Sequence, residues 1–168
     1  VTNAREGLDA PMSNLVYFMA ASPRSSPNLV LRKITRGVAA VVAGHESKLR
    51  LGTMHVVRDI CHARDFATAA MLLAVGDGAN GLPAAGDYAC ASGTGHSIRA
   101  MAELACTLAQ LDPEDVLEDD PSYARPNDIL SLVGDASKLR ALGWAPRVPF
   151  VELVRECLAH DLAALGVH

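Results

Sequence analysis

The sequence predicts an α/β fold that contains only part of a parallel sheet. Segments typical of strands and helices alternate along the chain, which indicates α/β construction. Residues 14–19, NLVYFM, form a short apolar run between turn residues, the pattern of a strand buried on both faces of a parallel sheet. Only two or three convincing strands occur, too few for a complete doubly wound sheet, so the chain begins as though part-way through a fold.

In the first half of the chain, apolar periodicity and turn residues define the elements. Residues 2–9 have the pattern of a helix end, and the Ser and Pro content of 20–28 predicts a loop. Residues 29–43 predict a helix, because apolar side chains recur near a 3.6-residue spacing and Gly44 follows them. The basic residues of this helix, Arg32 among them, lie mostly off that apolar stripe. The next expected elements are strands at 48–52 and 56–60 and a helix at 63–75.

In the second half, capping residues mark the helix starts. Glycines make residues 76–86 a surface loop, and 87–91, DYACA, have the pattern of a strand. Ser97 and Asp135 are suitable N-cap residues, and Pro149 suits the start of a last amphipathic helix. Helices are therefore expected at 97–110, 135–142 and 150–165.

Length and composition indicate one domain of ordinary size, or a large piece of one. Half of the 168 residues are hydrophobic, and a net charge of −4 with pI near 5.8 argues against sequence-independent binding to nucleic acid. No apolar run is long enough to span a bilayer, and the N-terminus lacks the features of a signal peptide. The four cysteines form no C-x-x-C pair, so no zinc site or disulfide framework is predicted, and a reducing cytoplasm fits best.

One stretch, residues 119–134 (DDPSYARPNDILSLVG), suits the binding of a phosphate. Arg125 presents a planar guanidinium that matches phosphate oxygens two at a time. Pro126 restricts the backbone just past it. The alternative is that Arg125 forms an ion pair with a neighbouring group or caps it.

Two further basic residues could act with Arg125. Arg58 lies close to an expected strand-to-helix transition, where a helix N-terminus attracts anions, and Lys33 lies on a helix just after the Ser/Pro loop. Arg58 and Arg125 could converge on the two phosphates of a nucleotide-linked substrate. Asp128 could then accept hydrogen bonds from ribose hydroxyls.

Each of these residues also has a structural interpretation, which spacing alone favours. Arg58 would pair with Asp59 or Asp65. Lys33 would belong to a solvated helix face, and Asp128 would cap a turn.

His62 and His96 suggest a general base or a metal ligand, but the pattern favours neither. No ligand spacing repeats around them, and no carboxylate accompanies them at a metal-binding spacing. A His at a helix start is more often a capping or packing residue. Cys61, close to Arg58, could have a lowered pKa, although a small buried hydrophobic residue is the more common role.

Several catalytic motifs are missing from the sequence. No G-x-G-x-x-G fingerprint follows a strand near the N-terminus, where a dinucleotide pyrophosphate would bind. None of the three tyrosines has a Lys four residues later, and no G-x-S-x-G elbow occurs. The residues themselves therefore indicate a binding site and no catalytic group.

Taken together, the segments resemble the C-terminal half of the GDP-mannose 4,6-dehydratase family, extended short-chain dehydrogenase/reductases that act on nucleotide sugars. The resemblance covers about residues 3–162, apart from length differences near 76–86 and 110–120. Its markers are SPR at 22–24, VLRKITRGVA at 30–39, LG at 51–52, RDICHARDF at 58–66, GHSIR at 95–99, YARP at 123–126, GDASKLRALGWAPRVPF at 134–150 and ELVRECLAHDL at 152–162.

The resemblance implies a partial Rossmann-type fold: the last strands of a parallel sheet and a small C-terminal substrate-binding α/β lobe. Residues 1–168 would form a single incomplete domain without the dinucleotide-binding part. In the family, NADP takes a hydride from C4 of GDP-mannose, water is lost from C5 and C6, and the hydride returns to C6, giving GDP-4-keto-6-deoxymannose. The implied cofactor is thus NADP, and the implied ligand is GDP-mannose or a related nucleotide sugar.

The same resemblance assigns roles to five positions. Lys33, with the backbone of Val30, would approach guanine. Arg58 and Arg125 would hold the pyrophosphate. Asp128, where the family has Glu, would accept hydrogen bonds from the ribose hydroxyls.

The chain also departs from the family pattern. The family's catalytic Thr, Glu, Tyr and Lys correspond to positions before Val1, so the isolated chain is expected to be inactive. The family's Asn-His-Glu is replaced by Met19-Ala20-Ala21, and its second loop Arg by Ser25. Its Trp-Gly is replaced by Ile60-Cys61. The chain could therefore be a GDP-sugar-binding module that acts with a separate N-terminal half, an inactive remnant that dimerises, or another nucleotide-sugar epimerase or reductase.

Overall fold

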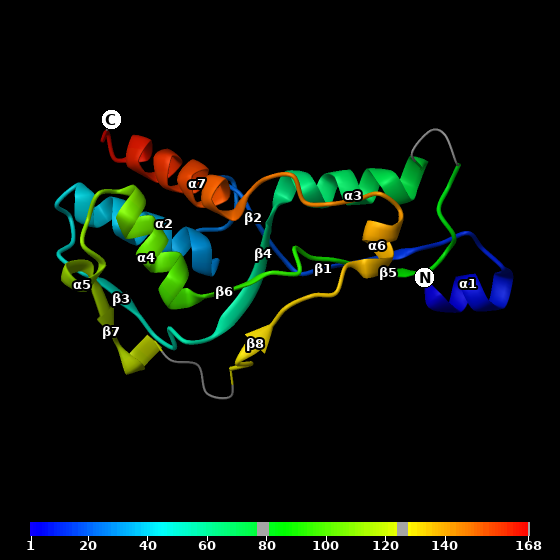
Figure 1. Ribbon diagram of the computed structural model, residues 1–168, viewed down its shortest axis with the longest axis horizontal. Helices are drawn as coiled ribbons and strands as arrows, with labels where there is room; N and C mark the ends of the chain where they lie inside the picture. Colours follow the sequence, from blue (N-terminus) through cyan, green and yellow to red (C-terminus); the bar gives the residue numbers. More distant parts are fainter. Residues whose placement is uncertain (77–80, 124–127, 168) are drawn as a thin grey trace.

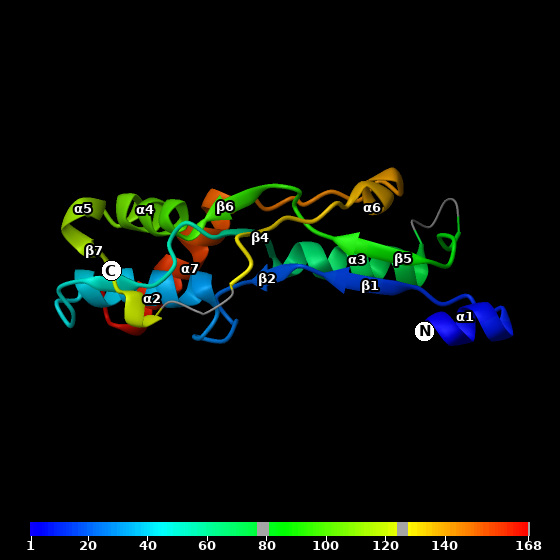
Figure 2. The ribbon, with the colours of Figure 1, turned by 90° about the horizontal axis from the view of Figure 1, so that it is seen from below.

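The computed structural model describes residues 1–76, 81–123 and 128–167 and has the predicted α/β composition, with mostly parallel strands. The molecule is elongated, with α2, α4 and α7 at one end and α1, β1 and α3 towards the other (Figures 1 and 2). In chain order the elements are α1 (Thr2–Leu8), β1 (Asn14–Tyr17), β2 (Met19–Ala21), α2 (Val30–Val42), β3 (Leu49–Leu51), β4 (Val57–His62), α3 (Ala63–Val75), β5 (Asp87–Cys90), β6 (Gly95–Ser97), α4 (Ile98–Leu108), α5 (Pro113–Val116), β7 (Leu117–Asp119), η1 (Pro121–Tyr123), β8 (Ser131–Leu132), α6 (Ser137–Ala141) and α7 (Phe150–Ala164).

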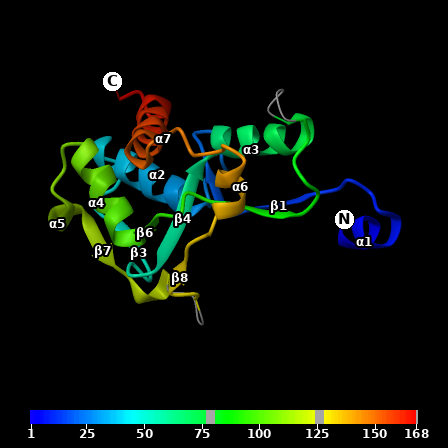
Figure 3. The same ribbon diagram turned by 45° about the vertical axis from the view of Figure 1, so that its right-hand side comes forward.

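The helical lobe, the end formed by α2, α4 and α7, holds the larger hydrophobic core. α2 packs against both other helices with its apolar stripe, and Figure 3 shows the three together. α4 starts where predicted, because the Ser97 hydroxyl accepts a hydrogen bond from the N–H of Ala100 at 3.0 Å. The largest fully buried apolar side chains of this core are Leu31, Ile34, Val38, Met101, Leu153 and Val154.

The strand lobe, the end formed by β1, β5, α3 and α6, has a second, smaller core. β1 and β5 pair in parallel, and the core beside them contains Phe66, Tyr88, Leu139 and Trp144. The indole N–H of Trp144 donates to the carbonyl of Asp65 at 3.0 Å, which ties the loop before α7 to α3.

β4 connects the two lobes. It pairs in parallel with β2 and β8 and antiparallel with β6, and its Ile60 and Cys61 belong to the helical-lobe and strand-lobe cores respectively. Asp59, in the middle of β4, has a buried carboxylate that accepts four hydrogen bonds at 2.6–3.2 Å. The donors are the N–H and the hydroxyl of Ser92 and the N–H groups of Gly93 and Gly134. Asp59 therefore fixes the segment before β6 and the segment after β8 against β4.

The prediction of a single strand at 14–19, buried on both faces, was wrong. The run divides into β1 and β2, and Val16 and Tyr17 are 54% and 48% exposed. Within the described part of the chain β1 pairs only with β5, so its second edge has no strand partner there. An apolar strand at such an edge remains exposed despite its sequence pattern.

The structure also has more strands than the four segments expected from the sequence. The described residues form eight, and β2, β6, β7 and β8 have only two or three residues each. Segments this short cannot display the alternation that identifies a strand in a sequence.

Arg32, expected among basic residues mostly off the apolar stripe, is 4% exposed. Its guanidinium lies between α2 and α7, where it meets the carboxylate of Asp161 at 2.6 and 2.7 Å. The partner on a distant helix allows a charge to be buried that helical spacing alone would place in water.

Candidate functional site

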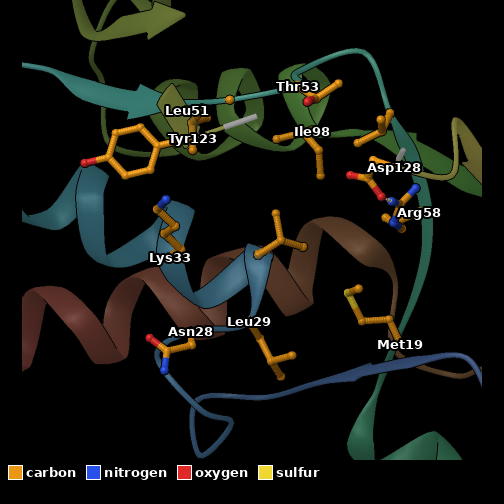
Figure 4. Close-up of a pocket in the computed structure, with 13 residues that line it drawn as sticks. Met19, Asn28, Leu29, Lys33, Leu51, Thr53, Arg58, Ile98, Tyr123 and Asp128 are labelled. Atoms are coloured by element: carbon orange, nitrogen blue, oxygen red, sulfur yellow. Dashed lines mark hydrogen bonds and ion pairs between the residues drawn. The ribbon is translucent and has the colours of Figure 1, made fainter. Parts of the chain in front are cut away.

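A cavity of about 230 Å³ lies between the start of α2 and the first half of β4 (Figure 4). Four of the five predicted site residues line it: Val30, Lys33, Arg58 and Asp128. They come from three places in the chain that are far apart in sequence. The fifth, Arg125, lies outside the described residues.

Arg58 is held rigidly at one side of this cavity. Its Nη1 donates to the carbonyls of Val57 and Ile129, both at 2.8 Å, and its Nη2 donates to Oδ1 of Asp128 at 2.7 Å. β8 pairs with the start of β4 beside these bonds, and the N–H of Val57 donates to the carbonyl of Leu130 at 2.8 Å. The segment after residue 128 is thereby fixed to β4, and Arg58 keeps one orientation.

Lys33 lies at the other side of the cavity, on the first turns of α2. Its Nζ is 4.2 Å from the centroid of the Tyr123 ring, a cation–π distance. Tyr123 is 53% exposed and lines the cavity, as Figure 4 shows. The pair presents an ammonium and an aromatic ring beside each other, groups that suit a planar ligand with carbonyl oxygens.

The N-terminus of α2 contributes backbone donors near Lys33. Leu29, its N-cap, has extended dihedral angles (φ −68°, ψ 141°), and no side chain of the described residues caps the helix. Leu29 and Val30 both line the cavity. The first N–H groups of a helix carry partial positive charge, so acceptor atoms of a ligand are favoured here.

The alternative prediction that Arg58 pairs with Asp59 or Asp65 is wrong, since both carboxylates accept hydrogen bonds from other groups. Asp59 accepts the hydrogen bonds of the turn segments described above. Asp65 accepts from the N–H groups of Arg147 and Val148 at 3.0 and 3.2 Å. Arg58 pairs with Asp128 instead, which brings two predicted ligand-binding residues into direct contact.

The expectation of capping and packing roles for the histidines is confirmed. The Nδ1 of His62 accepts from the N–H of Arg64 at 2.9 Å and caps α3, while its Nε2 lies 3.0 Å from Glu156. His96 stacks on Phe150 with 3.9 Å between ring centroids, and burial lowers its pKa. Across the described ranges, no three His, Cys, Asp or Glu side chains cluster as metal ligands.

Cys61 is buried, as expected for a small hydrophobic residue. Desolvation, aided by the negative charge of Asp59, raises the pKa of its thiol to about 12. A thiol with such a pKa is protonated at neutral pH and is a poor nucleophile. The suggestion of a lowered pKa is therefore wrong.

Two features of this site were not assigned from the sequence. Tyr123 was noted only as part of the YARP marker, although its position two residues before Arg125 was a usable signal. Met19 lines the cavity close to Arg58, at one of the positions where the family has a polar residue (Figure 4). That departure thus falls inside the cavity.

Known proteins resemble this chain in sequence and in fold. A protein named GDP-mannose 4,6 dehydratase 2 from Arabidopsis thaliana is 34% identical over 161 residues, which are 95% of this chain and 42% of that protein. A GDP-mannose 4,6-dehydratase from Vibrio cholerae is 30% identical over all of this chain and 51% of its own length. The chain thus spans about half the length of these relatives.

The structure of RMD from Pseudomonas aeruginosa complexed with NADPH is similar in fold. It superposes with a TM-score of 0.80 at 21% identity, over 96% of this chain and 51% of the other. The predicted α/β fold of Rossmann type is confirmed by this likeness. No helix of the described residues is sufficiently long and apolar to cross a bilayer. The sequence profile described as GDP-mannose 4,6 dehydratase matches residues 1–157, and this chain belongs to that family.

Proposed function

We propose that this chain provides the GDP-sugar-binding part of a GDP-mannose 4,6-dehydratase, which forms GDP-4-keto-6-deoxymannose. One observation carries the proposal: a single cavity gathers Val30, Lys33, Arg58 and Asp128, the described residues to which the family resemblance gives a ligand role. Lys33 and the α2 N-terminus would bind guanine. Arg58, together with Arg125, would hold the diphosphate, and Asp128 would accept from the ribose.

NADP would supply the hydride acceptor for the reaction of the whole enzyme. The described residues do not fit it. The direct strand-to-helix turns, from β4 to α3 and from β6 to α4, are capped by the side chains of His62 and Ser97 and lack the glycines that let a pyrophosphate approach the backbone. The only G-x-G-x-x-G string, residues 76–81, follows helix α3 instead of a strand.

A catalytic role for this chain alone is not part of the proposal. The sequence contains no Tyr-x-x-x-Lys, and the described residues that line the cavity include no histidine or cysteine. Incubation with GDP-mannose and NADP should therefore give no 4-keto product. Product formation by the purified chain would contradict this expectation.

The proposed function includes a partner protein that binds at the unpaired edge of β1. Val16 and Tyr17 are half exposed, and a strand edge with apolar side chains favours pairing with another strand. The partner would be either the remaining half of a dehydratase or a second copy of this chain. The cytoplasm is the proposed compartment, which the four free, buried cysteines support.

Binding of GDP tests the proposal directly. Thermal unfolding should shift upward on addition of GDP, because a ligand at about 100 times its Kd stabilises the folded state by about 2.7 kcal/mol. UDP at the same concentration is the control, and it should shift the midpoint less. An equal response to UDP would favour another nucleotide-sugar enzyme. No response to GDP at about 1 mM, equivalent to binding weaker than about −4 kcal/mol, would overturn the proposal.

A further inference from the structure

A second cavity, of about 360 Å³, lies between β6 and the segment that leads into α7. Thr94 and His96 line it from the side of β6, and Arg147 and Phe150 line it from the side of α7. Ile60 of β4 also lines it. Among the described residues, none lines both this cavity and the one beside α2, so the second cavity is separate from the proposed nucleotide-sugar site.

Buried carboxylates fix the backbone on both sides of this second cavity. Asp59 accepts hydrogen bonds from the N–H groups of residues 92–93, directly before β6, at 2.8 and 2.9 Å. Asp65 accepts from the N–H groups of Arg147 and Val148 at 3.0 and 3.2 Å. The two walls are thus held by the folded protein, and the cavity exists before any ligand arrives, as is usual for small-molecule sites.

One part of the lining is aromatic and apolar. The rings of His96 and Phe150 are stacked, with 3.9 Å between centroids and 11° between the ring planes. Burial lowers the pKa of His96, so its imidazole is uncharged at physiological pH. Ile60, Pro146 and Val148 add apolar surface. Aromatic rings favour stacked and edge-to-face contacts with other rings, so a flat aromatic body suits this part of the cavity.

The polar groups of the lining favour an anion. Among the described residues, no acceptor meets the guanidinium of Arg147, and no partner meets the Thr94 hydroxyl or the ring nitrogens of His96. The described lining contains no Asp or Glu. A guanidinium presents paired N–H donors that match the two oxygens of a carboxylate, and a hydroxyl or a neutral imidazole can each add one donor.

We propose that the second cavity binds a small aromatic carboxylate, with the carboxylate at Arg147 and Thr94 and the ring against His96 and Phe150. The site lies outside the cavity of the proposed function, and its occupation does not require GDP. It assigns to the loop before α7 a binding role in addition to its structural one.

Titration of the full chain with benzoate, followed by the amide signals in nuclear magnetic resonance spectra, tests this site. Benzoate should bind with a Kd of about 1 mM, an ordinary affinity for so small a ligand. The shifted amides should belong to the segments 92–96 and 147–150, and those beside the α2 cavity should not move. Benzamide keeps the ring but lacks the charge, and it should bind at least about tenfold more weakly. Cyclohexanecarboxylate keeps the charge but lacks the flat ring, and it should bind about fivefold more weakly.

Three variants assign these preferences to residues. Arg147→Gln removes the cation and should reduce the preference for benzoate over benzamide to about twofold or less. Phe150→Leu should reduce the preference for benzoate over cyclohexanecarboxylate to a similar extent. Arg36→Gln, at an exposed residue of α2 that lines neither cavity, is the matched control for charge and should leave all affinities unchanged. Thermal unfolding verifies that each variant is folded, and if Phe150→Leu is not, the comparison of Arg147→Gln with Arg36→Gln is sufficient.

Several results would overturn the proposal. One is the absence of saturable amide shifts at about 10 mM benzoate, ten times the expected Kd. Another is a set of shifts confined to the α2 cavity. A third is an equal loss of benzoate affinity in Arg147→Gln and Arg36→Gln, because net charge alone would then explain binding. The response of the protein to GDP affects none of these results, so the proposed function and this site fail or hold separately.

Discussion

The buried pair between Arg32 and Asp161 gives the sharpest test of how the helical lobe is held together. The two side chains are 5% and 6% exposed and form a bidentate contact at 2.6 and 2.7 Å. Thr35 adds a hydroxyl donor to the same carboxylate at 2.7 Å, and the Cys157 carbonyl accepts from Arg32 at 3.2 Å. The Nε of Arg32 is buried without a partner among the described residues, so the guanidinium depends on Asp161.

Replacing Asp161 by Ala should destabilise the protein by about 3–5 kcal/mol, because an uncompensated charge then remains buried. That is a large part of the roughly 5–15 kcal/mol that keeps a typical domain folded. The double variant Arg32→Met, Asp161→Leu removes both charges and fills the space. It should be close to the unsubstituted protein in stability, since apolar replacements of buried pairs are often neutral.

Urea unfolding with two probes measures these changes. Fluorescence of Trp144 reports on the strand lobe, where this residue is 5% exposed, and far-ultraviolet circular dichroism reports mainly on the helices. If residues 1–168 form a single domain, as the sequence predicts, both midpoints should fall together in the Asp161 variant. A loss of less than about 1 kcal/mol would refute the reasoning about the buried charge. A double variant as unstable as the single one would show that packing, and not charge, is responsible.

Two other predictions concern β4. Asp59→Asn should lower the free energy of unfolding, measured in urea, by about 3 kcal/mol or more. An amide nitrogen, itself a donor, would then face two of the four groups that now donate to Asp59. Asp119→Asn, at an exposed residue, is the matched control, and an equal loss in both variants would contradict the prediction. Cys61 should react slowly with iodoacetamide at pH 8 until the protein is unfolded, and rapid native labelling would contradict its raised pKa. Its pKa rises from 9.0 to about 12 on folding, so the native state holds the proton longer and stability should fall as pH rises from 9 to 12.

The sequence predicts the long elements because their signals are local. The limits of α3 agree with the structure residue by residue, and those of α2 and α7 agree within one residue. Each has a clear apolar stripe and a recognisable start or stop. The short strands could not be predicted from the sequence, because they form only through pairing with distant segments. β8, for example, pairs with β4 and has no sequence pattern of its own.

The candidate site follows the same division. Arg58, Lys33 and Asp128 were identifiable from residue type and from family markers, which are local in the sequence. Their contacts were not: Arg58 had two acidic neighbours within seven residues, yet it pairs with Asp128, which is 70 residues away. The carboxylates of these acidic neighbours do not pair with Arg58, because they accept hydrogen bonds from backbone N–H groups of later segments. Sequence proximity cannot reveal such competition between acceptors.

The network around Arg32 explains how the stability of the helical lobe affects the site. Arg32 lies next to Lys33 on α2, and its side chain joins α2 to α7 while Lys33 and Val30 line the cavity. The ion pair and the buried apolar stripe of α2 together hold this helix against α7, and in this arrangement Lys33 lies beside Tyr123. A charge that local spacing would place in solvent therefore contributes to holding the helix that carries the proposed base-binding residues, through a contact between residues 129 positions apart.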